Sequence, residues 1–248
     1  MGDWMKRLLL VAALGGTALV VGPGVARADL LPVPSGWTCS GTCGSDSAEG
    51  DVPLSPLNNP TYQYISTYNG ITGVGINPDG ASNPTNGSLL TTSDFAATDN
   101  TSLSFYFDFI TSDGGTFADN AWAALYTASG TLVSEIYDST TGASIANGNA
   151  STVSWLGPSS SGACYAGGCG NTGWTLAQYT ITSAGSYYMA FGVTNAYDTA
   201  FDTGLAIDGV AVNGEQISPS VSAPEPTSLA LLGVGLFGLL ALRRPRTL

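Results

Sequence analysis

Hydrophobic and polar residues alternate in the middle of the chain. In the run LSFYFDF, apolar residues occupy every second position from Leu103 to Phe109, with Ser104, Tyr106 and Asp108 between them. A period of two is typical of a β-strand, and one buried face beside one wetter face indicates an antiparallel sheet. Similar runs occupy residues 62–68, 121–127, 131–137, 175–182, 186–194 and 205–212. We expect a strand at each of these runs.

Turn-forming residues separate the runs, and no convincing helical stripe lies among them. The turn signals are Asn69-Gly70, Asp79-Gly80, Asp113-Gly114-Gly115, Ser129-Gly130, Ala184-Gly185 and Thr203-Gly204. Short strands separated by such turns predict an all-β fold, and we expect an antiparallel, jelly-roll-like β-sandwich. The Gly-rich and polar stretches 78–86, 142–149 and 157–170 are expected to be exposed loops.

The N-terminus has the pattern of an export signal. Lys6 and Arg7 precede an apolar run at residues 8–21, and the small residues Ala26 and Ala28 flank Arg27 in an A-x-A arrangement. This order predicts a signal helix that signal peptidase removes after residue 28. A buried N-terminal helix is the weaker alternative, because it does not require this order of zones.

The C-terminus carries a second apolar segment. Pro224, Glu225 and Pro226 precede an apolar run at residues 229–242, which Arg243 and Arg244 follow. The run is shorter than the roughly 20 residues of a stable membrane span, and its arginines favour the cytoplasmic side. We expect a short transmembrane helix, held transiently in the inner membrane and then cut, within a sorting tail at residues 224–248. A simple C-terminal anchor is the alternative.

The Pro-Glu-Pro motif, the short Leu/Gly-rich span and the arginine cluster together resemble the PEP-CTERM sorting signal of Gram-negative bacteria. The resemblance implies that an exosortase, a membrane protease-transpeptidase, recognises Pro224, Glu225 and Pro226. It further implies release to the cell surface or to an exopolysaccharide matrix, such as that of a biofilm. The motif would then be recognised by another enzyme, and it is no evidence for an enzymatic activity of this chain.

Basic residues occur only near the two ends of the chain, and nearly all acidic residues lie between them. All six basic residues lie at the ends, the chain has no His, and every acidic residue except Asp3 and Glu225 lies within residues 29–223. We expect these residues to form one β-sandwich domain. The absence of cations there excludes a basic nucleic-acid groove, a Lys Schiff base and a His-based triad. The uncompensated negative charge favours counter-ions such as Ca²⁺ and disfavours anionic partners.

Four cysteines occur in Gly/Ser-rich segments of this exported chain. Three residues separate Cys39 from Cys43, and four separate Cys164 from Cys169. Disulfides are expected in an exported protein, and the two local pairings close the smallest loops, although three connectivities are open. A zinc site is disfavoured because neither pair has the Cys-x-x-Cys spacing and no His is available.

Aspartates near two turns suggest a structural Ca²⁺ site. Asp113 and Asp119 bracket one glycine turn, and Asp202 and Asp208 flank Gly204, so two loops could supply oxygen ligands at one end of a sandwich. The segment 202–212 resembles the closing strand of galactose-binding-like and carbohydrate-binding jelly rolls, and this resemblance implies that Asp208 serves calcium. The alternative is that Asp113 and Asp119 cap turns.

Aromatic residues suggest a binding surface. Trp155, Tyr165 and Trp174 lie in or beside the long Gly/Ser-rich region, where exposed rings could stack on sugar faces. Trp37 and Trp122 are expected to be packed, because most tryptophans are largely buried.

Catalysis has less support in the sequence. A glycosidase needs paired carboxylates, but Glu135 lies in a predicted strand on the face opposite Leu132 and Ile136, which favours a solvated sheet face. We therefore assign no catalytic residue. The sequence favours a non-enzymatic, exported surface or matrix protein whose β-sandwich acts in adhesion, exopolysaccharide association or structure. A secreted glycan-active hydrolase is the alternative.

Overall fold

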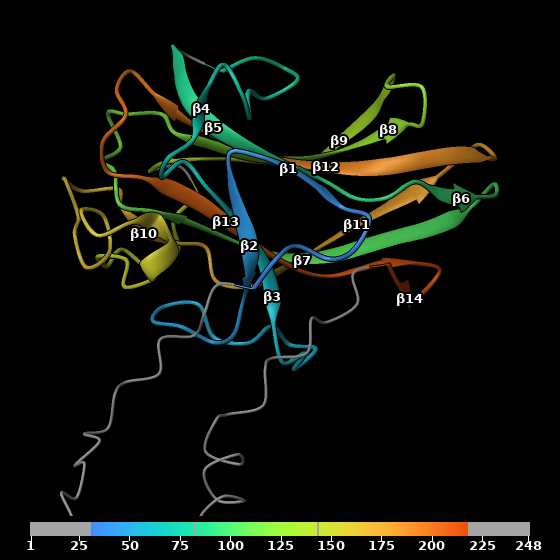
Figure 1. Cartoon of the computed structure of the whole chain (residues 1–248), viewed down its shortest axis with the longest axis horizontal. Helices are drawn as coiled ribbons and strands as arrows, with labels where there is room; N and C mark the ends of the chain where they lie inside the picture. The colour runs from blue at the N-terminus through green and yellow to red at the C-terminus, as the bar shows by residue number, and fades with distance from the viewer. Residues whose placement is uncertain (1–30, 82, 143, 218–248) are drawn as a thin grey trace, which may run out of the picture.

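The computed structural model describes residues 31–81, 83–142 and 144–217 (Figure 1). The predicted signal peptide, with Ala26 and Ala28, lies outside these residues, as does the predicted sorting tail with its transmembrane helix. No helix in the described ranges is long and apolar enough to cross a membrane.

The described chain forms two antiparallel sheets that lie as two layers in Figure 1. Sheet I has the order β1 (Thr38–Ser40), β5 (Pro84–Thr91), β12 (Gly185–Ala196), β8 (Asn120–Thr127) and β9 (Leu132–Thr140), with β4 (Ile71–Thr72) beside β5 and β6 (Phe95–Ala97) beside β12. Sheet II has the order β10 (Gly170–Asn171), β7 (Thr101–Thr111), β13 (Thr203–Val212), β3 (Tyr62–Ser66) and β2 (Thr42–Asp46), with β11 (Thr175–Ile181) beside β7 and β14 (Glu215–Gln216) beside β13. The predicted all-β class is confirmed, and the jelly-roll-like form stays a prediction.

Every run of alternating residues is a strand in the structure. The run at residues 103–109 extends to β7, and the other six correspond to β3, β8, β9, β11, β12 and β13. The loop prediction for residues 78–86 is wrong at its end, because Pro84 begins β5. That strand starts with polar residues and Gly87, so its N-terminal half lacks the alternation that predicted those seven strands. The loop prediction for residues 157–170 is likewise wrong at Gly170, which begins β10.

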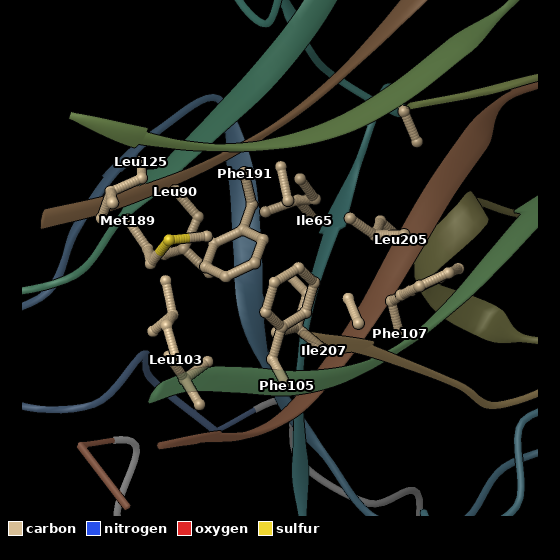
Figure 2. Close-up of a cluster of buried hydrophobic side chains, with 14 of the residues drawn as sticks. Ile65, Leu90, Leu103, Phe105, Phe107, Leu125, Met189, Phe191, Leu205 and Ile207 are labelled. Atoms are coloured by element: carbon tan, nitrogen blue, oxygen red, sulfur yellow. The ribbon is translucent and has the colours of Figure 1, made fainter. Parts of the chain in front are cut away.

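The main core lies between the two sheets (Figure 2). The apolar face of β7, from Leu103 to Phe109, faces Leu125, Met189 and Phe191 of sheet I. The ring of Phe105 meets the ring of Phe191 edge to face at 5.3 Å between centroids. Complete burial of each such side chain contributes about 1.5–3 kcal/mol to stability, so this interface holds the two sheets together.

The outer face of sheet II is also covered at one end. The short 3₁₀-helix η1 (Ser154–Leu156) places Trp155 against Tyr64, with the rings stacked at 5.1 Å. Asp108, expected on the wetter face of β7, is fully buried there, and Thr172 donates a hydrogen bond to its Oδ1 at 3.2 Å. The alternation identified the apolar face of β7, but it could not show that another segment covers the polar face.

Two irregularities in the pairing of β8 with β9 change the placement of Glu135. The register shifts between Ala123 and Ala124 and again between Leu125 and Tyr126, so that Glu135 lies opposite Ala124 and Leu132 lies opposite Tyr126. Ala124 and Tyr126 share one face of β8, so Glu135 and Leu132 share the outer face of sheet I. The prediction that Glu135 lies opposite Leu132 is therefore wrong, because bulges add residues to the period of two.

Candidate functional site

Three loops meet at the end of the sandwich where β10 lies in Figure 1. The loop after β7 bonds to the loop before β13 through Ser112 N and Asp202 O, at 3.2 Å. The segment before β10 bonds to the loop after β7 through Tyr165 N and Ser112 O, at 3.0 Å. We call this region, residues 112–119, 160–169 and 197–202, the loop end.

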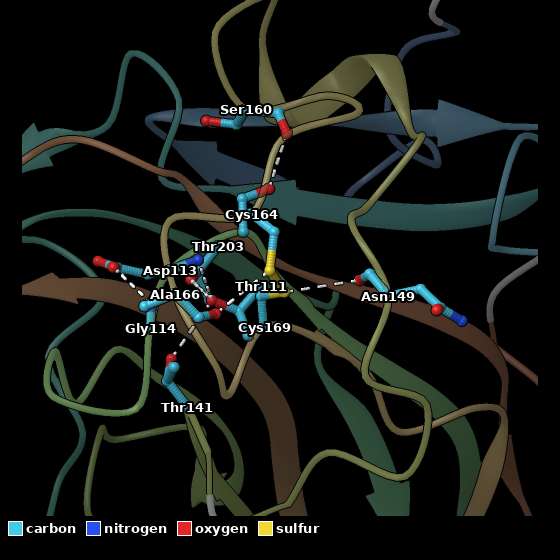
Figure 3. Close-up of a disulfide and its surroundings, with 11 residues drawn as sticks. Thr111, Asp113, Gly114, Thr141, Asn149, Ser160, Cys164, Ala166, Cys169 and Thr203 are labelled. Carbon is cyan, nitrogen blue, oxygen red and sulfur yellow. Dashed lines mark hydrogen bonds between the residues drawn. A yellow bond between two sulfur atoms is a disulfide. The ribbon is translucent and has the colours of Figure 1, made fainter.

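A disulfide closes one of these loops (Figure 3). Cys164 pairs with Cys169 across a Cα–Cα distance of 5.8 Å, and Cys39 pairs with Cys43 across 6.1 Å. The predicted local pairing is confirmed. With all four cysteines in disulfides, their thiolates are not available to hold zinc.

Four aromatic side chains gather at the loop end. Phe117 lies edge to face with Tyr165 at 5.4 Å and with Tyr197 at 6.4 Å, and Phe201 lies 5.1 Å from Tyr165. Tyr165 is 53% exposed and Tyr197 is 54% exposed. We call these four residues the aromatic cluster. It presents two phenol rings to solvent, and the rings of Phe117 and Phe201 contact them from neighbouring loops.

The backbone of the aromatic cluster is strained. Tyr197 has a φ of +72° and Phe201 a φ of +58°, a left-handed conformation that is unusual for bulky residues. Such a residue costs on the order of 1–3 kcal/mol and persists only where its surroundings determine it. The Tyr197 amide donates to Asn83 O at 2.9 Å, and the Ala200 amide donates to Asp198 Oδ1 at 2.9 Å. These bonds hold the loop in its strained form.

Three of the four predicted calcium ligands lie at or beside the loop end. Asp113 Oδ1 accepts a hydrogen bond from the Gly114 amide at 2.6 Å, as a turn cap does, while its buried Oδ2 has no partner. Asp119 instead accepts bonds from Ala196 N at 2.8 Å and from Thr203 Oγ1 at 2.6 Å. Asp202 accepts bonds from Thr67 Oγ1 and Ser160 Oγ, both at 3.1 Å.

Burial raises the pKa of each of these three carboxyls. The pKa of Asp119 rises to about 8 and that of Asp113 to about 6, because burial penalises the charged form more than hydrogen bonds stabilise it. The pKa of Asp202 is raised for the same reason. Neighbouring carboxylates add to the effect at Asp113 and Asp119, so the loop end retains protons at pH values where exposed acids are ionised.

Asp208 does not join the other three aspartates. It lies within β13 opposite Tyr106, accepts a bond from Asn59 Nδ2 at 2.9 Å and accepts another from Ser55 Oγ. The expected four-residue set is therefore not assembled. Within the described ranges, no group of three or more His, Cys, Asp or Glu side chains is arranged to hold a metal ion. Calcium binding at the loop end stays a prediction.

The predicted aromatic ligands separate into two places. Tyr165 is exposed in the aromatic cluster. Trp155 is only 2% exposed, because its ring fills the core on the outer face of sheet II. It has no free face for a sugar, so the prediction that Trp155 binds a sugar is wrong. Trp174 is half-buried beside the same core, with its ring 5.6 Å from that of Tyr62 and its Nε1 donating to Pro53 O at 2.8 Å. Trp37 and Trp122 are packed as expected, at 7% and 3% exposure.

The other three members of the aromatic cluster, Phe117, Tyr197 and Phe201, were not predicted from the sequence. Each lies near Gly, Asp or Asn in a connection between predicted strands, and an aromatic residue in such a polar connection was the available signal. Their contact with Tyr165 could not be predicted, because it depends on three loops that are distant in sequence.

These features define a disulfide-containing β-sandwich with an aromatic cluster at one end. A comparison with protein families indicates how the chain is exported. Residues 222–244 match the PEP-CTERM protein-sorting motif, which begins two residues before Pro224 and includes Arg243 and Arg244. The chain is therefore an exported protein that is processed at the membrane, and the predicted resemblance is confirmed. A search of curated proteins finds no similar sequence.

Solved structures with a similar arrangement include adhesin and carbohydrate-binding domains. A cleaved adhesin domain of Lys-gingipain from Porphyromonas gingivalis W83 is 14% identical, with 73% of this chain and 91% of that chain covered and a TM-score of 0.38. TmCBM61 in complex with β-1,4-galactotriose is 10% identical, with 72% and 88% covered and a TM-score of 0.34. At these values the likeness carries no argument about function.

Proposed function

We propose that this chain is an exported surface or matrix protein whose β-sandwich binds a neutral glycan at the aromatic cluster. This binding would serve adhesion or association with exopolysaccharide, without catalysis. The observation that carries the proposal is the pair of exposed rings, Tyr165 and Tyr197, which neighbouring aromatic residues contact from the adjoining loops.

The chemistry of the cluster suits a sugar. The apolar face of a pyranose ring stacks on an aromatic ring, while its hydroxyl groups donate hydrogen bonds to nearby acceptors. Asp113 supplies a buried Oδ2 without a partner beside the cluster. Strained residues concentrate at binding sites, where rigidity lowers the entropy lost on binding, and the backbone at Tyr197 and Phe201 is strained.

Charge narrows the class of glycan. The described residues contain no Lys, Arg or His and many ionised acids. Uronate-rich or sulfated polysaccharides would meet repulsion across the whole surface and have no cationic side chain to pair with. A neutral polysaccharide avoids this repulsion, so the proposal is confined to neutral glycans.

Binding of the purified full-length protein to a glycan array, followed by affinity electrophoresis in gels containing the best neutral glycan, tests the proposal. We expect Tyr165→Ala to weaken binding about tenfold, as expected for the loss of one stacked ring. Leu176→Ala, at an exposed apolar residue on β11, is the matched control and should bind like the parent. Unchanged binding by the Tyr165→Ala/Tyr197→Ala double variant, or hydrolysis of the glycan, would contradict the proposal.

A further inference from the structure

A cavity of about 310 Å³ lies on the outer face of sheet I. Ser40 of β1, Leu89 of β5 and the pair Trp122 and Tyr126 of β8 line it, and residues 73–76, which follow β4, close one side. The walls come from four separate segments and combine apolar side chains with polar atoms.

Close backbone contacts fix the shape of the cavity. Gly75 has a φ of +75°, and a Cβ there would lie 2.1 Å from Val193 O, so only glycine lets this loop rest on β12. Its carbonyl accepts a hydrogen bond from Trp122 Nε1 at 2.8 Å. Beneath the same ring, a Cβ at Gly192 would lie 2.3 Å from Trp122. The ring of Tyr126 stacks on that of Tyr188 at 5.3 Å, so the aromatic walls are held before any ligand arrives.

A cluster of acids and amides adjoins the cavity on its β9 side. The register places Asp138 opposite Trp122 and Glu135 opposite Ala124, so both carboxylates lie on the face that carries the cavity. Asn77 directly follows the cavity wall, and its Nδ2 donates to Glu135 Oε1 at 3.2 Å and to Asp138 Oδ1 at 3.1 Å. We call Asn77, Asn120, Glu135 and Asp138 the acid–amide cluster.

Two acceptor atoms of this cluster are buried without a partner. They are Glu135 Oε2 and Asn120 Oδ1. Asn120 is only 6% exposed, and its Nδ2 already donates to Asp138 Oδ1 and to Ser139 O. A buried acceptor without a donor has lost its hydration with no hydrogen bond to compensate. Because both orphaned atoms are acceptors, a ligand that satisfies them must bring hydrogen-bond donors.

We propose that the cavity and the acid–amide cluster together bind a primary ammonium group carried on an apolar stem. The ammonium supplies three donors and no acceptor, which matches Glu135 and Asn120, and the stem lies against Leu89, Trp122 and Tyr126. The terminal torsion of a glutamate is broad, so the Glu135 carboxylate can turn an oxygen toward the cavity.

The local charge supports a cation. The described residues hold no basic side chain, and burial together with the charges of Asp138 and Asp79 raises the pKa of Glu135. A bound ammonium opposes that repulsion and favours the ionised carboxylate. Binding therefore strengthens as the pH rises through the range in which Glu135 ionises, and it weakens with added salt.

Calorimetric titration of the purified full-length protein with pentylamine and with 1-pentanol tests the site, because the two probes share a stem and differ in charge. We expect pentylamine to bind at least tenfold more tightly than 1-pentanol. We expect Glu135→Gln, which keeps the shape and removes the charge, to weaken pentylamine binding about tenfold. Asp99→Asn changes an exposed acid in another turn and should leave binding within twofold.

A second pair of probes distinguishes the sources of the ammonium. Tighter binding of the glucosamine trimer than of pentylamine assigns the site to amino sugars, and the reverse assigns it to aliphatic amines; the N-acetylglucosamine trimer is the neutral control.

Equal binding of pentylamine and 1-pentanol overturns the proposal. A Glu135→Gln variant that melts like the parent and binds pentylamine equally well overturns it too, as does Ca²⁺ that displaces pentylamine at stoichiometric concentration. Because Tyr165→Ala leaves this site intact, failure here is distinct from failure of neutral-glycan binding.

Discussion

Single buried polar groups are the least expected features of this interior. Gln63 is fully buried on β3, opposite Ile207. Its neighbours Tyr62 and Tyr64 point to the outer face, so Gln63 points into the core between the sheets. Neither its Oε1 nor its Nε2 has a hydrogen-bond partner. Since buried amides without partners lose their hydration with no compensation, this residue destabilises the sandwich.

Replacement of Gln63 by methionine, which has a similar shape, should therefore stabilise the protein. We expect a gain of about 1 kcal/mol, which for a domain of this size raises the Tm by roughly 2–4 °C. Thermal unfolding followed by circular dichroism measures the shift, and Gln178→Met at an exposed position on β11 is the control. A lower Tm for Gln63→Met would mean that the amide has a partner, such as a buried water, whose loss outweighs the apolar gain.

At the scale of elements, alternation predicted seven strands, because burial of one face forces the period of two; they are β3, β7, β8, β9, β11, β12 and β13. β5 was not predicted, since its first half reads PTNG and its packing comes from the glycine-containing loop after β4. The sequence also placed Asp113, Asp119 and Asp202 near one end of the sandwich. It could not place Phe117 and Tyr197 beside Tyr165, because loop conformations depend on tertiary contacts rather than on a local period.

The two disulfides offer a matched test of how these elements serve binding. Each closes a small loop, and the chain-entropy model gives about 2 kcal/mol of stabilisation for either. We expect the variants Cys39→Ser/Cys43→Ser and Cys164→Ser/Cys169→Ser to lose similar stability in urea unfolding. Only the Cys164–Cys169 disulfide closes the loop that carries Tyr165. Only the Cys164→Ser/Cys169→Ser variant should therefore also lose affinity for the neutral glycan. Equal glycan affinity of the two variants would show that the disulfide does not position the aromatic cluster.

For the whole molecule, buried acids couple stability to pH. The net charge is −12 at pH 7, and burial raises the pKa of Asp119 to about 8 and of both Asp46 and Asp108 to about 7. A carboxyl whose pKa is higher in the folded than in the unfolded state favours folding while it is protonated. Its contribution is complete below the unfolded pKa near 4 and is lost as the pH rises through the folded value.

The Tm should therefore fall as the pH rises from about 5 to about 8.5, the window between the unfolded and folded pKa values of these acids. Asp119→Asn mimics the protonated acid and can still accept the bond from Ala196 N. We expect this variant to melt at a higher temperature than the parent at pH 8.5 and to show a shallower dependence on pH. Asp99→Asn, at an exposed turn, should keep the slope of the parent. Parallel melting profiles for Asp119→Asn and the parent would contradict this account.

Export should also change the charge of the molecule, because every basic residue lies in the two terminal segments. Removal of the signal peptide and of the tail leaves a domain without a cation, which matches a surface that avoids anionic polymers and attracts ammonium groups. We expect the exported form to end near Pro224–Pro226, to lack Arg243 and Arg244, and to depend on an exosortase. Intact-mass measurement of the protein from the cell surface checks both ends, and Glu225→Ala should block tail removal while the signal peptide is still lost. A species outside the inner membrane that keeps Arg243 and Arg244 would contradict processing of the tail.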